Sequence, residues 1–295
     1  MKRWIAYLSL VACGEVKNKD VEPDAPEVPP DTPIEPDGPT GCSPTQAFAA
    51  HPIVAEVSSA SREETVSLPG NELEMFIVRL GEGTFRSRRA SMATEWSTPV
   101  RIDALGDVGI HTVTLDGLTA YVTFDGGANG SQIGIATRAT TDEEFGIVSP
   151  LANINSASTE LWPMTDATGK ALYFVSDRDG TSRLYRAVRT STTMPFGSPE
   201  VVDAPAGVFS PVITDGELGL YYSLIDGTGK FELYYSSRAS VDEGFPAGTK
   251  FPELTPVAGG WPGFVSQDHC RVYFMNEAEG GLGSLDVHLA TREPE

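Results

Sequence analysis

Short apolar and aromatic runs return along the chain at intervals of about fifty residues. The five copies are "EMFIV" at 74–78, "AYVTF" at 120–124, "LYFVS" at 172–176, "LYYSL" at 220–224 and "VYFMN" at 272–276. Turn-forming sequences such as "PGN", "DG" and "DATG" stand just before several of these runs. Short aromatic and β-branched runs between turn signals are typical of β-strands. The pattern therefore predicts an all-β chain made of repeats.

A series of arginines follows the aromatic runs, one in each repeat. Its members are Arg89, Arg138, Arg189, Arg238 and Arg292. An aromatic residue stands seven positions after each of the first four, at Trp96, Phe145, Phe196 and Phe245. A constant offset indicates a loop of constant length, and another short extended run follows the loop. Each repeat therefore predicts about four strands.

A period near fifty residues with about four strands is typical of β-propeller blades, which are small sheets that bury their faces on one another. We expect the inner strands at 65–68, 112–115, 162–165, 211–214 and 263–266. The chain ends three residues after Arg292, so the fifth repeat has no outer strand of its own. Because an unpaired sheet edge promotes aggregation, we expect the strand from Ile53 to Val57 to complete the last blade and close a five-bladed ring.

The first 42 residues have a different character. Lys2 and Arg3 precede an apolar run that ends in small residues at position 12, a pattern typical of a secretory signal. The quartet Leu10-Val11-Ala12-Cys13 resembles the bacterial lipobox, which implies cleavage before Cys13 and lipid attachment to its sulfur. We therefore expect an anchor in the cell envelope, and Gly14 in place of Asp favours the outer membrane. The alternatives are an ordinary signal peptide with an incidental cysteine, or a true start that lies upstream of Met1.

The segment between this cysteine and the repeats is predicted to be a tether. Residues 14–41 contain seven Pro, eight acidic residues and only four Val or Ile side chains. Such a segment buries too little apolar surface to offset the entropy of ordering, so we expect it to be disordered and extended. The predicted organisation is a signal peptide at 1–12, a lipid-anchored linker at 13–42 and a five-bladed propeller at 43–295.

Two further cysteines support the predicted ring closure. Cys42 stands just before the borrowed strand, and Cys270 precedes the second strand of the last repeat. In an exported protein an even pair of cysteines favours a disulfide, and the closure brings these two segments together. The alternative is two unrelated thiols.

Composition narrows the choice of partners. With 295 residues, 40% of them hydrophobic, the chain is long enough for a sizeable core, and it contains no uninterrupted apolar stretch of membrane-spanning length. A formal charge of -20 disfavours nucleic acid, which is bound mainly through lysine and arginine. An acidic surface also repels its own copies, so we expect a monomer.

The repeat pattern resembles the TolB-type, WD-repeat-like propeller family of bacterial envelope proteins. The resemblance is carried by "DATGKALYFVSDRDGTSRLYRAVR" in the third repeat and "QDHCRVYFMNEAEGGLGSLDVHLATR" in the fifth, and it spans residues 51–295. Two repeats depart from the family pattern. The first has "PGN" in place of the usual Asp-Gly turn, and the second, with "VTFDGGANG", lacks the Ser-Asp-Arg element. The resemblance implies the fold and an envelope location, and it assigns no catalytic residue.

Catalytic chemistry has little support in the sequence. Glu63 and Glu160 occupy corresponding positions before the first and third inner strands, and such a pair is what a five-bladed glycosidase requires. We expect both to be solvated loop carboxylates instead. The four histidines have no metal-ligand spacing, no nucleophile elbow or phosphate loop is present, and we expect no cofactor. Asp177 and Asp179 in "SDRDGTS" fit a tight turn better than a calcium loop.

Binding is the leading functional hypothesis. Trp162, Phe209 and Trp261 lie at or just before inner strands, where propellers open their central channel and aromatic faces stack on sugars or peptides. The alternative role for each of them is core packing. We expect a non-enzymatic envelope lipoprotein whose propeller binds a protein or glycan partner. The alternatives are an envelope glycan hydrolase acting through Glu63 and Glu160, or a structural spacer.

Overall fold

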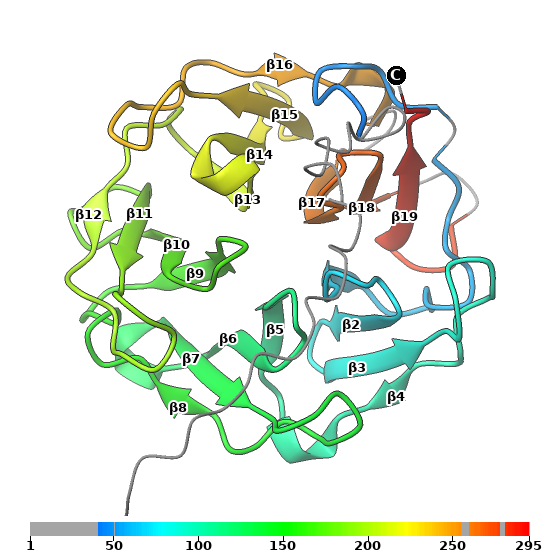
Figure 1. Cartoon of the computed structure of the whole chain (residues 1–295), viewed down its shortest axis with the longest axis horizontal. Helices are drawn as coiled ribbons and strands as arrows, with labels where there is room; N and C mark the ends of the chain where they lie inside the picture. Colours follow the sequence, from blue (N-terminus) through cyan, green and yellow to red (C-terminus); the bar gives the residue numbers. More distant parts are fainter. Residues whose placement is uncertain (1–40, 50, 255–259, 278–280, 295) are drawn as a thin grey trace, which may run out of the picture. The chain divides into compact units, whose positions relative to one another are not determined.

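Each of the five sequence repeats forms one antiparallel sheet, and the sheets are arranged around a central axis (Figure 1). The computed structural model describes residues 41–49, 51–254, 260–277 and 281–294. The predicted signal peptide, the lipidation site at Cys13 and nearly all of the linker lie outside these described residues. No helix among the described residues is long and apolar enough to cross a membrane.

The chain builds the blades in sequence order, with the first strand of each blade nearest the axis. Blade 1 contains β1 (Glu63–Ser67), β2 (Glu74–Arg79), β3 (Gly83–Arg88) and β4 (Val100–Arg101). Blade 2 contains β5 (Gly109–Val113), β6 (Thr119–Asp125), β7 (Ser131–Thr137) and β8 (Ser149–Pro150). Blade 3 contains β9 (Glu160–Thr165), β10 (Ala171–Ser176), β11 (Arg183–Val188) and β12 (Glu200–Val201). Blade 4 contains β13 (Phe209–Thr214), β14 (Gly219–Ile225), β15 (Phe231–Ser237) and β16 (Thr249–Lys250). Blade 5 contains β17 (Gly260–Val265), β18 (Arg271–Asn276) and β19 (Asp286–Thr291). Short 3₁₀ turns occupy Asp103–Leu105, Gly127–Asn129, Asp215–Glu217 and Pro252–Leu254.

The all-β, five-bladed prediction is confirmed, but the inner strands begin earlier than expected. β1 and β9 start at Glu63 and Glu160, so these carboxylates belong to strands and not to loops. Every inner strand also carries a register shift against its neighbour. In blades 3 and 4 a proline lies at the shift, where it removes a ladder donor, and the preceding Trp162 and Ser210 have positive φ values of 50° and 45°.

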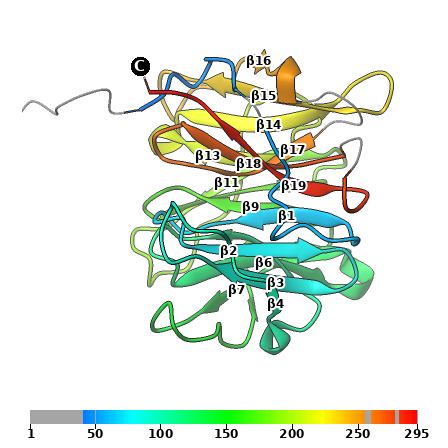
Figure 2. The same cartoon turned by 90° about the vertical axis from the view of Figure 1, so that its right-hand side faces the viewer.

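The N-terminal segment closes the ring against β19, as Figure 2 shows along the side of the molecule. Ile53 forms an antiparallel bridge with His288, and Val54 donates a backbone hydrogen bond of 2.8 Å to Val287. Ala49 donates another to Thr291. The predicted pairing is confirmed at Ile53, but its extent is different: the contact lies within residues 49–54, and residues 55–57 form a turn that leads toward β1. The predicted Cys42–Cys270 disulfide is present.

The repeated arginines join neighbouring blades. Each stacks its guanidinium on an aromatic ring and donates a hydrogen bond to the carbonyl of the turn between the first two strands of its own blade. The rings are Trp96, Phe145, Phe196, Phe245 and, for Arg292, Phe48. Since Phe48 belongs to the N-terminal segment, that segment supplies the aromatic residue that the fifth repeat lacks.

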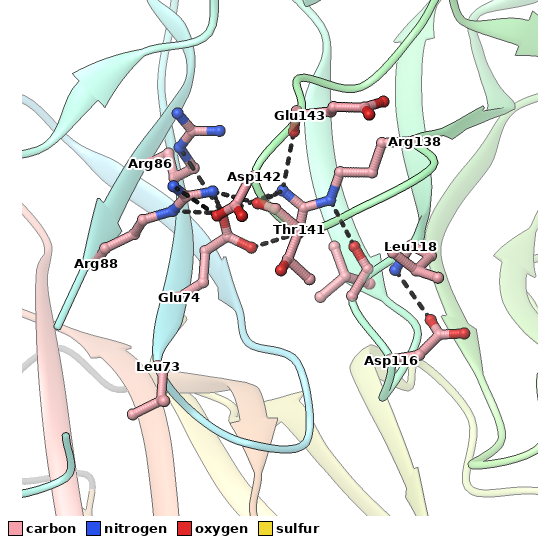
Figure 3. A network of polar contacts seen from close by, with 12 residues as sticks. Leu73, Glu74, Arg86, Arg88, Asp116, Leu118, Arg138, Thr141, Asp142 and Glu143 are labelled. Atoms are coloured by element: carbon pink, nitrogen blue, oxygen red, sulfur yellow. Dashed lines mark hydrogen bonds and ion pairs between the residues drawn. The ribbon is translucent and has the colours of Figure 1, made fainter. Parts of the chain in front are cut away.

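Four of the arginines also reach a buried tyrosine hydroxyl of the preceding blade. The pairs are Arg89 with Tyr273, Arg189 with Tyr121, Arg238 with Tyr173 and Arg292 with Tyr221. Arg138 faces Phe76, which has no hydroxyl, and pairs instead with Glu74 (Figure 3). Glu74 also binds Arg88, so one carboxylate replaces the missing tyrosine at the junction of blades 1 and 2.

Candidate functional site

The central channel has two different ends. The N-terminal ends of the inner strands define what we call the sealed end, and the turns that follow these strands define the open end. Figure 1 shows the five inner strands surrounding the axis. The predicted binding aromatics and the two predicted carboxylates all lie toward the sealed end.

Aromatic side chains pack against one another at the sealed end. The rings of Trp162 and Phe209 have centroids 4.0 Å apart, and Phe209 also contacts Phe231 and Trp261. Trp261 is buried and donates its indole hydrogen to the Glu64 carbonyl at 2.7 Å, whereas Trp162 and Phe209 are partly exposed. A cavity of only about 10 Å³ remains beside Trp162, close to the smallest space that holds one water. These aromatics therefore form a plug that leaves little space for a ligand beside Trp162, at this end of the channel.

Glu160 is fully buried and satisfied at the sealed end, so the expectation of a solvated loop carboxylate is wrong. Its carboxylate accepts hydrogen bonds from the Gln132 amide, the Ser156 hydroxyl and the Arg178 guanidinium at 2.8, 2.6 and 3.0 Å. Because the side chain begins on strand β9, it points among packed neighbours and not into solvent. Glu160 holds blade 3 to the loop that enters it.

Glu63 is also fully buried, and the same expectation is wrong for it. Its Oε1 accepts hydrogen bonds from Ser59 and Arg79 at 2.7 and 3.1 Å, while Oε2 has no hydrogen-bond partner. Burial raises the pKa of Glu63, and the charge of Asp286 adds to the effect, against the opposing contacts of Ser59 and Arg79. A raised pKa suits a general acid, but a carboxyl with no exposed surface cannot reach a glycosidic oxygen in this structure.

The open end holds a cavity of about 240 Å³. Its polar lining comes from all five blades: Ser67, Thr112, Thr165, Asp166, Thr214, Asp215, Glu217 and Gln267. Its apolar walls include Leu68, Val113, Met164, Val212, Ile213 and Phe264. A concave site with apolar walls and a few convergent polar groups is the usual form of a small-ligand pocket.

The turn after β13 places two carboxylates beside this cavity. Asp215, Gly216 and Glu217 all have left-handed backbone conformations, with φ values of 53°, 61° and 77°. Blades 2 and 3 place Gly117 and Gly169 at the position of Glu217, whereas blades 1 and 5 place Glu72 and His269 there, also with positive φ. Left-handed conformations cost non-glycine residues about 1–2 kcal/mol each, so blade 4 retains its acidic side chains against a local energetic preference.

Contacts to neighbouring strands hold these two carboxylates in place. Glu217 accepts hydrogen bonds from Arg186 and from the Tyr173 hydroxyl of blade 3. His269 Nε2 lies 2.6 Å from Asp215 Oδ1 and donates to it, because a carboxylate only accepts. Burial opposes ionisation of Asp215, but the hydrogen bond and charge of His269, with bonds from Tyr235 and Thr214, lower its pKa below the usual range. Asp215 is therefore ionised at neutral pH.

Asp166 is the third carboxylate of the cavity. It is buried and accepts hydrogen bonds from the backbone amides of Thr168, Lys170 and Ala171 and from the Thr168 hydroxyl. All of these donors are neutral, so the charge of Asp166 has no cationic partner among its hydrogen-bond donors. This arrangement also forms the tight turn between β9 and β10.

Other residues considered in the sequence have structural contacts. Asp177 accepts a hydrogen bond from the Thr159 amide and Asp179 accepts one from the Tyr185 hydroxyl, so both help to shape loops as expected. Among the described residues, no group of three or more His, Cys, Asp or Glu side chains is arranged to hold a metal ion. Sequence reasoning missed Asp215 and Glu217, although acidic residues on both sides of Gly216 distinguish this turn from those of the other repeats.

No protein-family model matches the chain, and no curated protein matches it. Among solved structures, the GH43_1 enzyme from Xanthomonas citri in complex with xylotriose is similar, with a TM-score of 0.58 and 11% identity over 82% of this chain and 89% of that one. The α-L-arabinofuranosidase PaAbf62A from Podospora anserina has a TM-score of 0.52 and 9% identity over 88% and 99% of the two chains. TolB from Acinetobacter baumannii has a TM-score of 0.45 and 14% identity, covering 80% of this chain and 56% of that one.

At these identities the similarities show the fold alone. The choice between hydrolysis and binding therefore depends on the side chains of the site.

Proposed function

We propose that the propeller is a non-enzymatic binding module whose site is the cavity at the open end of the channel. The observation that carries this proposal is the lining of the 240 Å³ cavity, which combines hydroxyl, amide and carboxylate groups from all five blades with apolar walls. The partner is a protein or a glycan that inserts a small group into the cavity.

The state of the carboxylates supports binding over hydrolysis. A glycosidase needs a carboxylic acid that is protonated when it meets the glycosidic oxygen, together with a second carboxylate across the bond. In the open cavity, Glu217 is held by Arg186, Asp166 is saturated by neutral donors and Asp215 has a lowered pKa. The carboxyl with a raised pKa, Glu63, is buried at the other end.

The cellular setting is part of the same proposal. The lipobox-like quartet ending at Cys13 and the acidic linker support a lipid-anchored envelope protein, with the outer membrane favoured by Gly14. We propose a monomer that does not bind nucleic acid, consistent with its charge of -20. Mass spectrometry of the mature N-terminus tests the proposed lipid anchor. An unmodified Cys13 would contradict it.

Site-specific photo-crosslinking in cells that make the protein tests the binding site. A photoreactive amino acid at Ala167, which is exposed beside the cavity, is expected to capture the partner. The same amino acid at Ile147, which is 90% exposed in blade 2 and does not line the cavity, is the control. Equal capture from both positions, or capture from neither, contradicts the proposed site.

A hydrolysis screen addresses the alternative. If the protein cleaves an envelope glycan and the Asp215→Asn variant loses that activity, the module is an enzyme and the binding-only proposal fails.

A further inference from the structure

We infer that the open-end cavity accepts a cationic group on an apolar stem, the chemistry of a lysine or arginine side chain on a protein partner. This inference rests on the proposed function and narrows the partner to one class. It starts from the sign of the charges around the cavity and from the chemistry of its walls.

The cavity is acidic without an opposing cation in its lining. Three carboxylates line it, and among the described residues of its wall there is no lysine or arginine. Arg186 neutralises Glu217 from outside the lining, but Asp166 is bound only by neutral donors. His269 contacts Asp215 from outside the lining, so Asp166 is the one of the three carboxylates without a basic side chain among its hydrogen-bond donors. The wall therefore keeps a negative potential, carried mainly by Asp166, that favours a cation and opposes an anion.

The loops around the open end carry mostly acidic side chains, with Lys170 as an exposed cation in the turn of blade 3. Arg138 donates hydrogen bonds to the carbonyls of both Gly117 and Glu143, which places the loop at 139–145 next to the turn of its blade. Arg238 joins Glu217 and Glu243 in the same way. These loops and the one after β3 carry the exposed residues Glu95, Asp142, Glu143, Asp242 and Glu243. An acidic rim attracts a basic partner over a distance of about one Debye length.

The walls favour a stem that is apolar. Met164, Val212 and Phe264 line the cavity together with the carboxylates of the turns. Lysine and arginine carry three or four methylene groups below a charged head, so they bury the stem against such walls while the head meets a carboxylate. A neutral sugar presents a C–H face, but it has no long unbranched apolar stem and no charged head.

The test is a titration of the isotopically labelled protein followed by NMR, reading the amide signals of Gly216 and Thr165. The probes are butylammonium and butylguanidinium, with neutral pentan-1-ol and anionic pentanoate as matched controls. The two cations are expected to bind at least about tenfold more tightly than the alcohol, with affinity falling as salt is raised from about 0.05 to 0.5 M. Acetyl-glycyl-lysyl-glycinamide is expected to shift the same signals.

Charge changes at the rim provide the variants. Gln267 lines the cavity, is exposed and follows the end of strand β17. Gln267→Lys is expected to weaken butylammonium binding about tenfold and Gln267→Glu to strengthen it. Ile225→Lys makes the same change in net charge at an exposed residue that ends β14, outside the cavity and its rim loops, and it is expected to change the affinity less than twofold.

The outcomes separate the two proposals. If no probe of any charge shifts the cavity signals, the proposed binding site itself fails. If the alcohol or the anion binds as well as the cations, or if Gln267→Lys has no effect, the site remains and the inference about charge fails. If butylammonium binds but the lysyl peptide does not, the ligand is a free amine and the inference about a protein partner is wrong.

Discussion

The two ends of the channel contain the same kinds of residue but place them differently. At the sealed end, Glu63 and Glu160 begin inner strands and are fully buried among hydrogen-bond partners. At the open end, Asp215 and Glu217 lie on a turn, where their carboxylates face a cavity while other groups hold them. In this propeller, the carboxylates on inner strands therefore have structural roles, whereas the carboxylates on the turn are available to a ligand.

The neighbouring side chains reinforce this difference. The sealed end has bulky rings that fill the axis, with Phe209 in contact with both tryptophans. At the open end the inner strands present mainly Ser, Thr, Val and Gly to the cavity, so space remains. The comparison predicts that changes at the sealed end act on stability and that changes at the open-end turn act on binding.

The largest expected effect on stability concerns the disulfide that holds the N-terminal segment at the open end. Replacing Cys42 and Cys270 by Ala removes a link across 228 residues, which in the chain-entropy model costs about 5 kcal/mol. The loss is measured as a fall in the urea midpoint. Wild-type protein treated with reductant is the matched control, and an unchanged midpoint in both would show that Phe48 and the bridge at Ile53 close the ring without the disulfide.

At the sealed end, Glu160→Ala is expected to lower the free energy of unfolding by about 3 kcal/mol, because it leaves the Arg178 charge without its buried partner. Glu200→Ala, an exposed change in the same blade, is the control and is expected to change stability by less than about 0.5 kcal/mol. Urea denaturation of both variants measures the difference. Equal effects would contradict the structural role of Glu160.

His111 adds a pH dependence beside the aromatic plug. Burial lowers its pKa to about 4, whereas an unfolded histidine titrates near 6.5. Between these values the unfolded chain binds more protons, so stability falls as the pH falls through this range. Between pH 7 and pH 5 the wild type is expected to lose about 2 kcal/mol more than His111→Asn, measured by urea denaturation at both pH values. Equal losses of stability in the wild type and in His111→Asn would show that His111 has the same pKa in the folded and unfolded states.

The smallest expected effect on stability is at the open end. Asp215→Asn keeps a side chain that tolerates the left-handed conformation but removes the charge beside His269, and it is expected to cost less than about 1 kcal/mol because the site is partly exposed. Since the pKa of Asp215 is lowered, its contribution is present above the usual carboxyl range and is lost as the pH falls below it. The urea midpoints of the wild type and of Asp215→Asn at pH 7 and pH 3 measure this contribution. A larger difference between the two proteins at pH 3 than at pH 7 would contradict the lowered pKa of Asp215.

The repeats made the architecture predictable. Recurrence of the aromatic runs predicted five blades, and the constant offset between each arginine and its aromatic residue reflects the stacking seen in four blades. The missing aromatic after Arg292 was also visible, but nothing local identified Phe48 as its replacement. These two residues are 244 positions apart, and only ring closure brings them together.

The site was less predictable than the fold. Trp162, Phe209 and Trp261 were placed correctly near inner strands, but their contacts with one another depend on three different blades. Glu63 and Glu160 were expected in solvent because the strands were predicted to begin two residues later. A shift of two residues at a strand end moved both carboxylates into the packed interior.

The sequence by itself determined the number of blades, the spacing of their strands and the residues that join each blade to the next, because these features repeat and depend on neighbours close in the chain. Only the tertiary structure decided which channel end is filled, how far the N-terminal segment pairs with β19, and that Asp166 and Asp215 share a cavity. Those outcomes depend on the packing of side chains from different blades around one axis, where the space left by each depends on the volume of the others.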